Sequence, residues 1–278
     1  TLLARALPAL LPPLDGDELL DVLRVRSVVQ GEVSLDQPQR PFRAPHHSIS
    51  AAGLIGGGRP LSPGEVTIAH GGVLFLDELP EFPRRALECL RQPLEDGFLT
   101  ITRAGCRVTF PARVMIVAAC NPCPCGYFGS QARGCVCTPT AVQRYQARLS
   151  GPMLERIDLQ VRMDRPAADL LLATDAANQE TSEQVACRIR QARRFAVERQ
   201  GCLNARLHKQ LIKVVRPEAS TLDLLRSASD RLSLSPRLTT RLIKVARSIA
   251  DLAGNETVSP KHLAEAFSLR LSAKEAAS

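Results

Sequence analysis

Aromatic side chains are scarce in this sequence, and tryptophan is absent from it. Only 4% of the 278 residues are Phe, Tyr or Trp. Proteins that bind single strands by stacking bases need a series of such rings, so the composition gives that mode of binding little support. Any nucleic acid would instead have to be held through basic side chains on its backbone phosphates.

Long apolar runs are missing as well. The longest one, Val114 to Cys120, is far too short to cross a bilayer, which takes about 20 residues. A basic and then apolar leader with a small-residue cleavage site is not found either. We therefore expect a cytoplasmic protein without a membrane partner.

Cysteine is plentiful, but its distribution is not that of a disulfide scaffold. Four of the nine cysteines form two close pairs, Cys123-Pro-Cys125 and Cys135-Val-Cys137, and no export signal accompanies them. Four thiolates on one loop can close a tetrahedral structural Zn²⁺ site. The alternative is a set of four reduced thiols in a flexible loop.

The remaining composition is that of a folded protein with a basic surface. Apolar residues make up 45% and charged residues 23% of the chain, with a net charge of +8. Such a chain can bury a core in one large or two modest domains. Its positive charge suits a polyanionic partner, and it equally suits a solvated basic face that binds nothing.

Strand and helix signals alternate up to about Pro166, whereas only helix signals follow. We therefore expect a core over residues 1–166 and a helical domain over residues 167–278. The predicted fold class is α/β, with a parallel-sheet core followed by an all-α lid. The lid helices are expected over residues 182–199, 209–214, 218–232, 236–252 and 260–271.

The core has its own sequence of elements. Prolines 12 and 13 end a first helix, and a second follows over residues 15–25. Residues 37–64, rich in Pro, Gly, His and Ser, indicate a long loop or insertion. The pattern also predicts buried strands at 73–76 and 114–120, a β-hairpin over 98–110, helices at 83–95 and 140–149, and a fourth short strand after Arg156.

Two adjacent acids follow the first buried strand, in the stretch VLFLDE. A parallel strand delivers its carboxyl end to the crevice where α/β sheets bind ligands. There Asp77 can hold the Mg²⁺ of a nucleotide, and Glu78 can orient and deprotonate the attacking water. The alternative is a core strand that simply ends in a charged turn, which is the commoner meaning of such a run in isolation.

Three other polar residues fit the same chemistry. Asn121 ends the second buried strand, where an amide can hold the lytic water or the γ-phosphate. Arg156 precedes the fourth expected strand, and Arg237 opens a helix. An arginine that reaches the γ-phosphate stabilises charge in the transition state. Taken singly, an Asn after a strand is an ordinary turn former and most arginines are solvated.

Order and spacing make this set specific. The sequence resembles the ComM/YifB group of magnesium-chelatase-like AAA+ ATPases, related more distantly to the chelatase motor subunit and the MCM helicases. The resemblance covers essentially the whole chain. It rests on the stretches RPFRAPHH, GEVTIAHGGVLFLDELPEF, LRQPLEDG, NPCPCGY, RLSGPMLERIDL and VARSIADLAG.

The resemblance implies an ATP- and Mg²⁺-dependent ring motor and gives each polar residue a role. Asp77 and Glu78 would be the Walker B pair, and Asn121 would be sensor 1. Arg156 would be the arginine finger that acts on a neighbouring subunit, and Arg237 would be sensor 2. Because Arg156 is useful only if a neighbour supplies the nucleotide, the partner is expected to be the chain itself, in a homo-hexamer.

The sequence departs from the family in one respect. A motor of this class needs a Gly-rich loop that ends in Gly-Lys-Ser/Thr, and the chain as given has none. It resembles the family from the last residue of that loop, which makes Thr1 the hydroxyl that would ligate Mg²⁺. We therefore expect an upstream part with the phosphate loop and its central strand. Without it, the chain alone should expose strand edges, bind ATP poorly and be inactive.

The motor is expected to act on DNA, either branched or single-stranded. It would serve as a helicase or catalyse branch migration during recombination or natural transformation. Arg103 and Arg107 at the hairpin tip are the candidate phosphate contacts. His46 and His47 lack a third metal ligand nearby, so they indicate a structural or DNA-facing loop. Two alternatives stay open, a chelatase-type motor that remodels a metal-insertion enzyme, and a non-catalytic, zinc-stabilised binding module.

Overall fold

The computed structural model of the chain describes residues 1–31, 39–103, 106–130, 133–149, 151–163, 180–207 and 211–271. The chain divides into two compact units, a first unit over Thr1–Arg156 and a second unit over Ile157–Ser278. The boundary expected near Pro166 lies among residues 164–179, outside the described residues.

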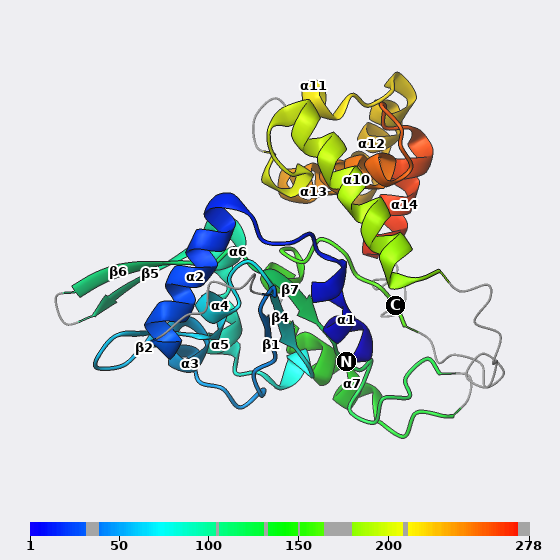
Figure 1. Ribbon diagram of the computed structural model, residues 1–278. Helices are drawn as coiled ribbons and strands as arrows, with labels where there is room; N and C mark the ends of the chain where they lie inside the picture. The colour runs from blue at the N-terminus through cyan, green and yellow to red at the C-terminus, as the bar shows by residue number, and fades with distance from the viewer. Residues whose placement is uncertain are drawn as a thin grey trace. The chain divides into compact units, whose positions relative to one another are not determined.

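The first unit is built on a parallel sheet of three strands. Its order is β1 (Phe42–Arg43), β4 (Val73–Leu76) and β7 (Met115–Ala118). All four residues of the central β4 are buried, whereas those of β7 are only partly buried or exposed. Figure 1 shows β4 between its two neighbours, with helices on either side. This arrangement is a mixed α/β fold, as the sequence predicted.

Residues 39–64 are not the long loop that the sequence indicated. They contain β1, helix α3 (Ala51–Ile55) and the small hairpin of β2 (Gly56–Gly57) and β3 (Ser62–Pro63). β1 was missed because two residues are too few to show an alternating pattern. Its approach to β4 depends on Gly72, since a Cβ there would lie 1.9 Å from the carbonyl oxygen of Pro41.

Helices surround this sheet. Arg40 holds the connection between the first two helices of the chain. Its guanidinium donates to the carbonyl oxygens of Pro12 and Gly71 and pairs with Glu18 at 2.9 Å. The single helix expected over residues 83–95 is divided in two, because Pro93 has no N–H and cannot continue a helix from its preceding turn. Besides α3, the described part of this unit contains the helices α1 (Leu2–Leu10), α2 (Gly16–Gln30), α4 (Glu65–Ile68), η1 (Leu79–Glu81), α5 (Arg84–Cys89), α6 (Arg91–Asp96), α7 (Pro139–Ala147) and α8 (Gly151–Leu154).

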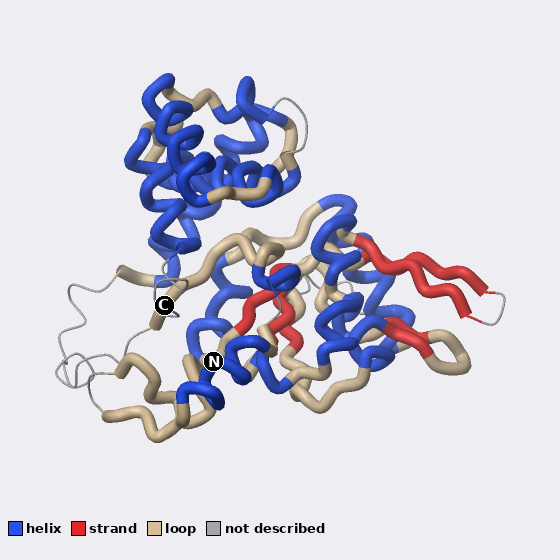
Figure 2. Tube along the Cα trace, turned by 180° about the vertical axis from the view of Figure 1, so that it is seen from behind, coloured by secondary structure: helices blue, strands red, loops and turns tan. Residues whose placement is uncertain are grey.

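A hairpin extends from the first unit. Strands β5 (Phe98–Arg103) and β6 (Cys106–Pro111) pair in antiparallel register, with Thr102 opposite Arg107. Figures 1 and 2 show the two strands running out beyond the helices of this unit. Residues 104 and 105 at the tip lie outside the described residues.

The second unit is helical. Its elements are α10 (Ser182–Gln200), η3 (Asn204–Arg206), α11 (Leu211–Val215), α12 (Ala219–Leu232), α13 (Pro236–Leu252) and α14 (Pro260–Leu271). The fourth short strand expected after Arg156 is absent, because residues 157–163 form no sheet. Within that segment the backbone N–H of Gln160 donates instead to the carbonyl oxygen of Leu269 in α14, at 2.7 Å.

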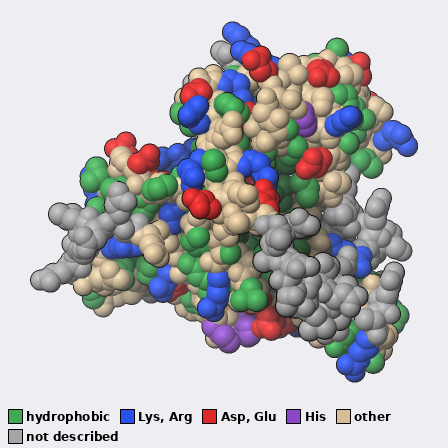
Figure 3. Space-filling model, turned by 45° about the vertical axis from the view of Figure 1, so that its right-hand side comes forward, with side chains coloured by type: hydrophobic (Ala, Val, Ile, Leu, Met, Phe, Trp, Pro, Cys, Tyr) green, Lys and Arg blue, Asp and Glu red, His purple; other side chains and the backbone are tan. Residues whose placement is uncertain are grey.

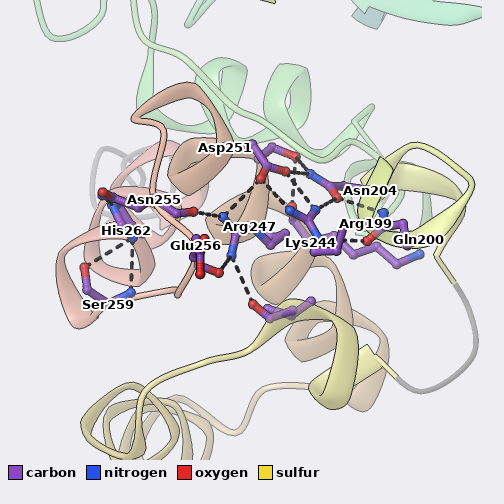
Figure 4. Close-up of polar contacts among 12 residues, drawn as sticks. Arg199, Gln200, Asn204, Lys244, Arg247, Asp251, Asn255, Glu256, Ser259 and His262 are labelled. Atoms are coloured by element: carbon purple, nitrogen blue, oxygen red, sulfur yellow. Dashed lines mark hydrogen bonds and ion pairs between the residues drawn. The ribbon is translucent and has the colours of Figure 1, made fainter. Parts of the chain in front are cut away.

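A buried ionic network holds the helices of the second unit together. Arg199 of α10 donates two hydrogen bonds to Asp251 of α13, at 2.7 and 2.9 Å, and Asn204 donates a third at 2.7 Å. Arg247 pairs with the same carboxylate at 3.0 Å and also donates to the carbonyl oxygens of Val215 and Glu256 (Figure 4). Burial alone would raise the pKa of Asp251, but the hydrogen bonds from Arg199 and Asn204 and the charge of Arg247 lower it.

The Asp251→Asn variant is predicted to destabilise the second unit by about 3 to 5 kcal/mol, because it leaves two buried guanidinium groups without their counter-charge. Asp223→Asn is the matched control, since Asp223 pairs with Arg226 at 3.1 Å on an exposed helix face. That change should cost less than about 1 kcal/mol. Hydrogen exchange of the α13 amides measures both opening free energies. Equal costs in the two variants would contradict the account of the network.

Candidate active site

The carboxyl end of β4 presents two carboxylates. Asp77 and Glu78 follow directly after Leu76, and both are exposed although the strand before them is buried. The turn is tied to the neighbouring strand, since the N–H of Ala119 donates to Leu76 and that of Leu79 donates to Ala119, both at 2.9 Å. The two acids therefore stand at a fixed place on the edge where parallel sheets bind ligands.

Thr1 lies beside Asp77. Its hydroxyl donates to the Oδ2 atom of that carboxylate at 2.9 Å, although the two residues are far apart in the chain. A hydroxyl and a carboxylate at this spacing are both hard oxygen donors of the kind that Mg²⁺ takes. The structure thus brings together the two residues that the sequence proposed as magnesium ligands.

Glu78 has an unusual backbone conformation. Its φ and ψ of 54° and 47° lie in the left-handed region, which costs roughly 1 to 2 kcal/mol for a residue with a Cβ. Such outliers gather at functional sites, where the surroundings hold them in place. The Oε2 atom of Glu78 lies 3.0 Å from Nδ1 of His47. His47 is a residue of this site for which sequence reasoning offered only a structural or DNA-facing loop.

Asn121 lies at the same edge of the sheet, three residues after the end of β7, and its side chain is exposed. β4 and β7 run parallel with Leu76 opposite Ala118, so both strands end at this edge. Gly126 of the cysteine loop lies near Asn121, since a Cβ built on this glycine would be 3.9 Å from the Asn121 side chain. The cysteine loop and the strand end are therefore neighbours.

The two arginines proposed to act on phosphate belong to different units of the chain. Arg156, in the turn after α8, is buried, and its guanidinium contacts the carboxylate of Glu95 at 2.5 Å. Arg237 is the second residue of α13, in the second unit, and is partly buried. The structure therefore brings together Thr1, Asp77 and Glu78. Arg156 instead contacts Glu95, a carboxylate of its own unit.

The four clustered cysteines converge in space. The Sγ atoms of Cys123, Cys125, Cys135 and Cys137 all lie within 4.8 Å of one another. Three of the separations are 3.4, 3.5 and 3.7 Å. Four thiolates around one Zn²⁺ at about 2.3 Å would be roughly 3.8 Å apart, so the arrangement has the size of a tetrahedral zinc site.

Hydrogen bonds within the cysteine loop shift the pKa values of Cys125 and Cys135 in opposite directions. Backbone N–H groups of Tyr127 and Val136 donate to Cys125 and lower the pKa of its thiol to about 6. The backbone N–H of Cys137 favours the thiolate of Cys135, but burial and S–H contacts with the other thiols outweigh it and raise the pKa of Cys135 to about 12. One thiolate is thus present near neutral pH to start metal binding.

Two of the remaining candidates, Arg107 and His46, are exposed. Arg107 is exposed on β6, whereas the side chain of Arg103 lies outside the described part of the chain. His46 is exposed, and its Nδ1 atom lies 2.8 Å from the hydroxyl oxygen of Ser48. Over the residues that the structure describes, none of the helices has the length and apolar character needed to span a membrane.

Two family models match the sequence in succession. The one described as magnesium chelatase, subunit ChlI, covers residues 1–171, and the one described as magnesium chelatase, subunit ChlI C-terminal, covers residues 179–270. Together they span most of the chain. The break between them lies among residues 172–178, which the structure does not describe.

Individual relatives agree with these matches. The chain is 43% identical to the competence protein ComM of Haemophilus influenzae and 42% identical to the uncharacterized protein YifB of Escherichia coli, over 97% of its length in both cases. It covers 53% of each of these proteins, so it spans about half the length of the curated relatives it matches. A maternal DNA replication licensing factor, mcm6 of Xenopus tropicalis, is 26% identical over 74% of this chain and 25% of its own.

In the metal-free protein, Cys125 is predicted to be alkylated by iodoacetamide with a rate that is half-maximal near pH 6, because only the thiolate reacts. Peptide mass spectrometry across a pH series measures this rate. The Cys125→Ser variant is the control and should lose the fast fraction below about pH 7. A half-maximal rate above about pH 8 would contradict the described hydrogen bonding.

Proposed function

This chain belongs to the magnesium chelatase ChlI family, in its ComM/YifB branch, and from that premise we propose that it forms the catalytic part of an ATP-hydrolysing AAA+ ring motor acting on DNA. In this proposal residues 1–166 are the nucleotide-binding core and residues 167–278 are the lid. The observation that carries the proposal is the grouping of Thr1, Asp77 and Glu78 at the carboxyl end of a central parallel strand.

The chain's own residues would divide the chemistry among them. Mg²⁺ supplies electrostatic stabilisation of the phosphates when it is bound. Asp77 and the hydroxyl of Thr1 would hold that ion, since their oxygens already lie 2.9 Å apart. Glu78 would accept the proton of the attacking water, and Asn121 would orient that water or the γ-phosphate from the adjoining strand end.

The two arginines would contact phosphate in different ways. Arg156 would leave Glu95 and reach the nucleotide of a neighbouring subunit, which requires a ring such as a homo-hexamer. Its present carboxylate partner supports this exchange, because a guanidinium that binds one carboxylate also binds a phosphate. Arg237, near the start of α13, would be the sensor 2 residue that contacts the γ-phosphate.

The positive charge of the chain favours DNA as the molecule on which the motor acts. The net charge is +8, and the hairpin of β5 and β6 carries the exposed Arg107 close to its tip. Arg107, together with Arg103, would track backbone phosphates of branched or single-stranded DNA. The names of two relatives, a competence protein and a DNA replication licensing factor, agree with DNA work such as helicase action or branch migration.

The cysteine cluster would hold a structural Zn²⁺. Its four sulfurs have the spacing of a closed tetrahedral site, and such sites stabilise folds and take no part in catalysis. A bound ion would fix the loop whose Gly126 lies near Asn121. Zinc would therefore stabilise the loop next to Asn121, the proposed sensor 1 residue, without contacting the nucleotide.

A second candidate keeps the ATPase and changes its client. The matching families are named for magnesium chelatase, so the motor could instead remodel a partner enzyme that inserts a metal. A third is a non-catalytic binding module that is stabilised by zinc at the four converging sulfurs. Adding DNA or a chelatase partner to an ATPase assay separates the first two, and the absence of any hydrolysis would favour the third.

The product of the complete reading frame is predicted to hydrolyse ATP with Mg²⁺ and to do so faster with forked or four-way DNA. Glu78→Gln should lower the rate about 100-fold or more while ATP still binds, because it removes the proton acceptor. Glu88→Gln is the matched control, since Glu88 pairs with Arg84 on the exposed face of α5, and it should keep the rate within about twofold. If DNA leaves the rate unchanged while a chelatase partner raises it, the DNA assignment is wrong.

Purified protein is predicted to contain one zinc ion per chain by elemental analysis, because the four sulfurs fit a single tetrahedral site. Cys123→Ser should lose most of this zinc and lower the melting temperature. The control is Cys187→Ser, since Cys187 is an exposed free cysteine on α10, and it should keep both properties. Equal zinc contents in the two variants would refute the site.

A further inference from the structure

The cysteine loop, which connects β7 to α7, carries two adjacent aromatic side chains. Tyr127 is partly buried, and Phe128 is 38% exposed. The whole chain has only eight phenylalanines and two tyrosines, so this pair is a local exception to its composition. We propose that Tyr127 and Phe128, together with Arg133, form a contact site for unpaired bases of single-stranded DNA. This inference rests on the proposed action on DNA and names the part of the chain that would hold a single strand.

The cysteine cluster holds the backbone of the aromatic pair. The N–H of Phe128 donates to the Sγ atom of Cys123 at 3.3 Å, and the N–H of Tyr127 donates to Cys125. The pair follows Gly126, whose φ of 81° lies in the left-handed region that a glycine adopts without strain. The backbone under both rings is therefore ordered before any ligand binds, which lowers the entropic cost of binding.

Arg133 adds a positive charge to the pair. Its guanidinium carbon lies 4.7 Å from the centroid of the Tyr127 ring, and its Nη1 atom donates to the Tyr127 hydroxyl at 3.4 Å. The Arg133 side chain is exposed, so its guanidinium can stack on a base or contact a phosphate. The surface at the lower right of Figure 3 likewise carries hydrophobic and basic side chains beside one another. Stacking surface and positive charge are the two parts that single-strand sites combine.

The sequence around the loop contains no acidic residue. Between Asp96 and Glu155 there is neither Asp nor Glu. The same stretch contains six arginines, Arg103, Arg107, Arg113, Arg133, Arg144 and Arg148. It stays positive even when four thiolates surround a divalent ion, although Arg148 pairs with Glu81 at 2.9 Å. The charge of this stretch favours a polyanion as the molecule that covers the exposed ring.

A single strand suits this pair better than a duplex does. In a duplex the faces of the bases are stacked on one another, and only their edges are accessible in the grooves. In a single strand the faces are free, and every base has one, so a contact with an aromatic ring tolerates any sequence. Two rings can take about one or two bases. Arginine contacts to the phosphates would supply the rest of the affinity.

The test measures how the product of the complete reading frame binds a fluorescent oligodeoxythymidylate over a series of salt concentrations. Phe128→Leu should weaken binding about 5- to 50-fold, because one stacked base is lost. It should leave the slope of log affinity against log salt unchanged, because the ring neutralises no phosphate. Phe128→Trp should bind at least as tightly as the wild type. Phe98→Leu is the control, since Phe98 is 41% exposed at the start of β5, and it should stay within about twofold of the wild type.

The outcomes separate this inference from the function on which it rests. If the wild type binds the oligonucleotide and Phe128→Leu binds it equally well, the stacking contact is wrong. An equal loss of affinity for duplex DNA, or a smaller salt slope for Phe128→Leu, would also overturn it. So would a loss of ring assembly by Phe128→Leu in analytical ultracentrifugation, which would assign the pair to a contact between subunits. If the wild type binds no DNA, the proposed action on DNA fails as well.

A second measurement does not depend on the folding of any variant. An oligonucleotide that carries 5-iodouracil is bound to the wild-type protein and irradiated, so that the modified base links to an aromatic side chain stacked on it. Peptide mass spectrometry should then find the adduct on Tyr127 or Phe128. Adducts confined to other peptides, such as the hairpin of β5 and β6, would overturn the proposal.

Discussion

The parallel pairing of β1, β4 and β7 is the constraint on which the candidate site depends. Strands that run in one direction end at one edge, so residues from three distant parts of the chain meet there, His47 after β1, Glu78 after β4 and Asn121 after β7. The pairing in turn depends on close approach at Gly72, where no side chain fits beside Pro41. A larger residue at that position would move β1 away from β4 and separate His47 from Glu78.

Much of the candidate site could be predicted from the sequence because its signals are local. An apolar run that ends in two acids is visible without any knowledge of tertiary structure, and so is an Asn after a second run. The proximity of Thr1 to Asp77 came from the family resemblance alone, since no local pattern links the start of the chain to the end of β4. The cysteine spacing likewise indicated a cluster, and the four sulfurs do converge.

Other features could not be read from the sequence because tertiary contacts decide them. β1 is two residues long and leaves no periodic signal, so His47 could not be placed at the sheet edge. Residues 157–163 have the apolar character of a strand, but their backbone bonds to α14. The carboxylate that Arg156 contacts, Glu95, is also distant in sequence, and no spacing rule identifies it. Sequence patterns reveal helices and strands that are long enough to show a period. Which distant residues then bond to one another depends on the folded chain.

The central claim is that Thr1, Asp77 and Glu78 surround the magnesium-bound phosphates of ATP. The most direct measurement is an electron cryomicroscopy structure of the product of the complete reading frame with Mg²⁺ and a slowly hydrolysed ATP analogue. The account predicts the ion between the Thr1 hydroxyl and the Asp77 carboxylate, with Glu78 facing the terminal phosphate and an arginine from the next subunit beyond it. Nucleotide bound elsewhere, with Asp77 and Glu78 left in solvent, would contradict it.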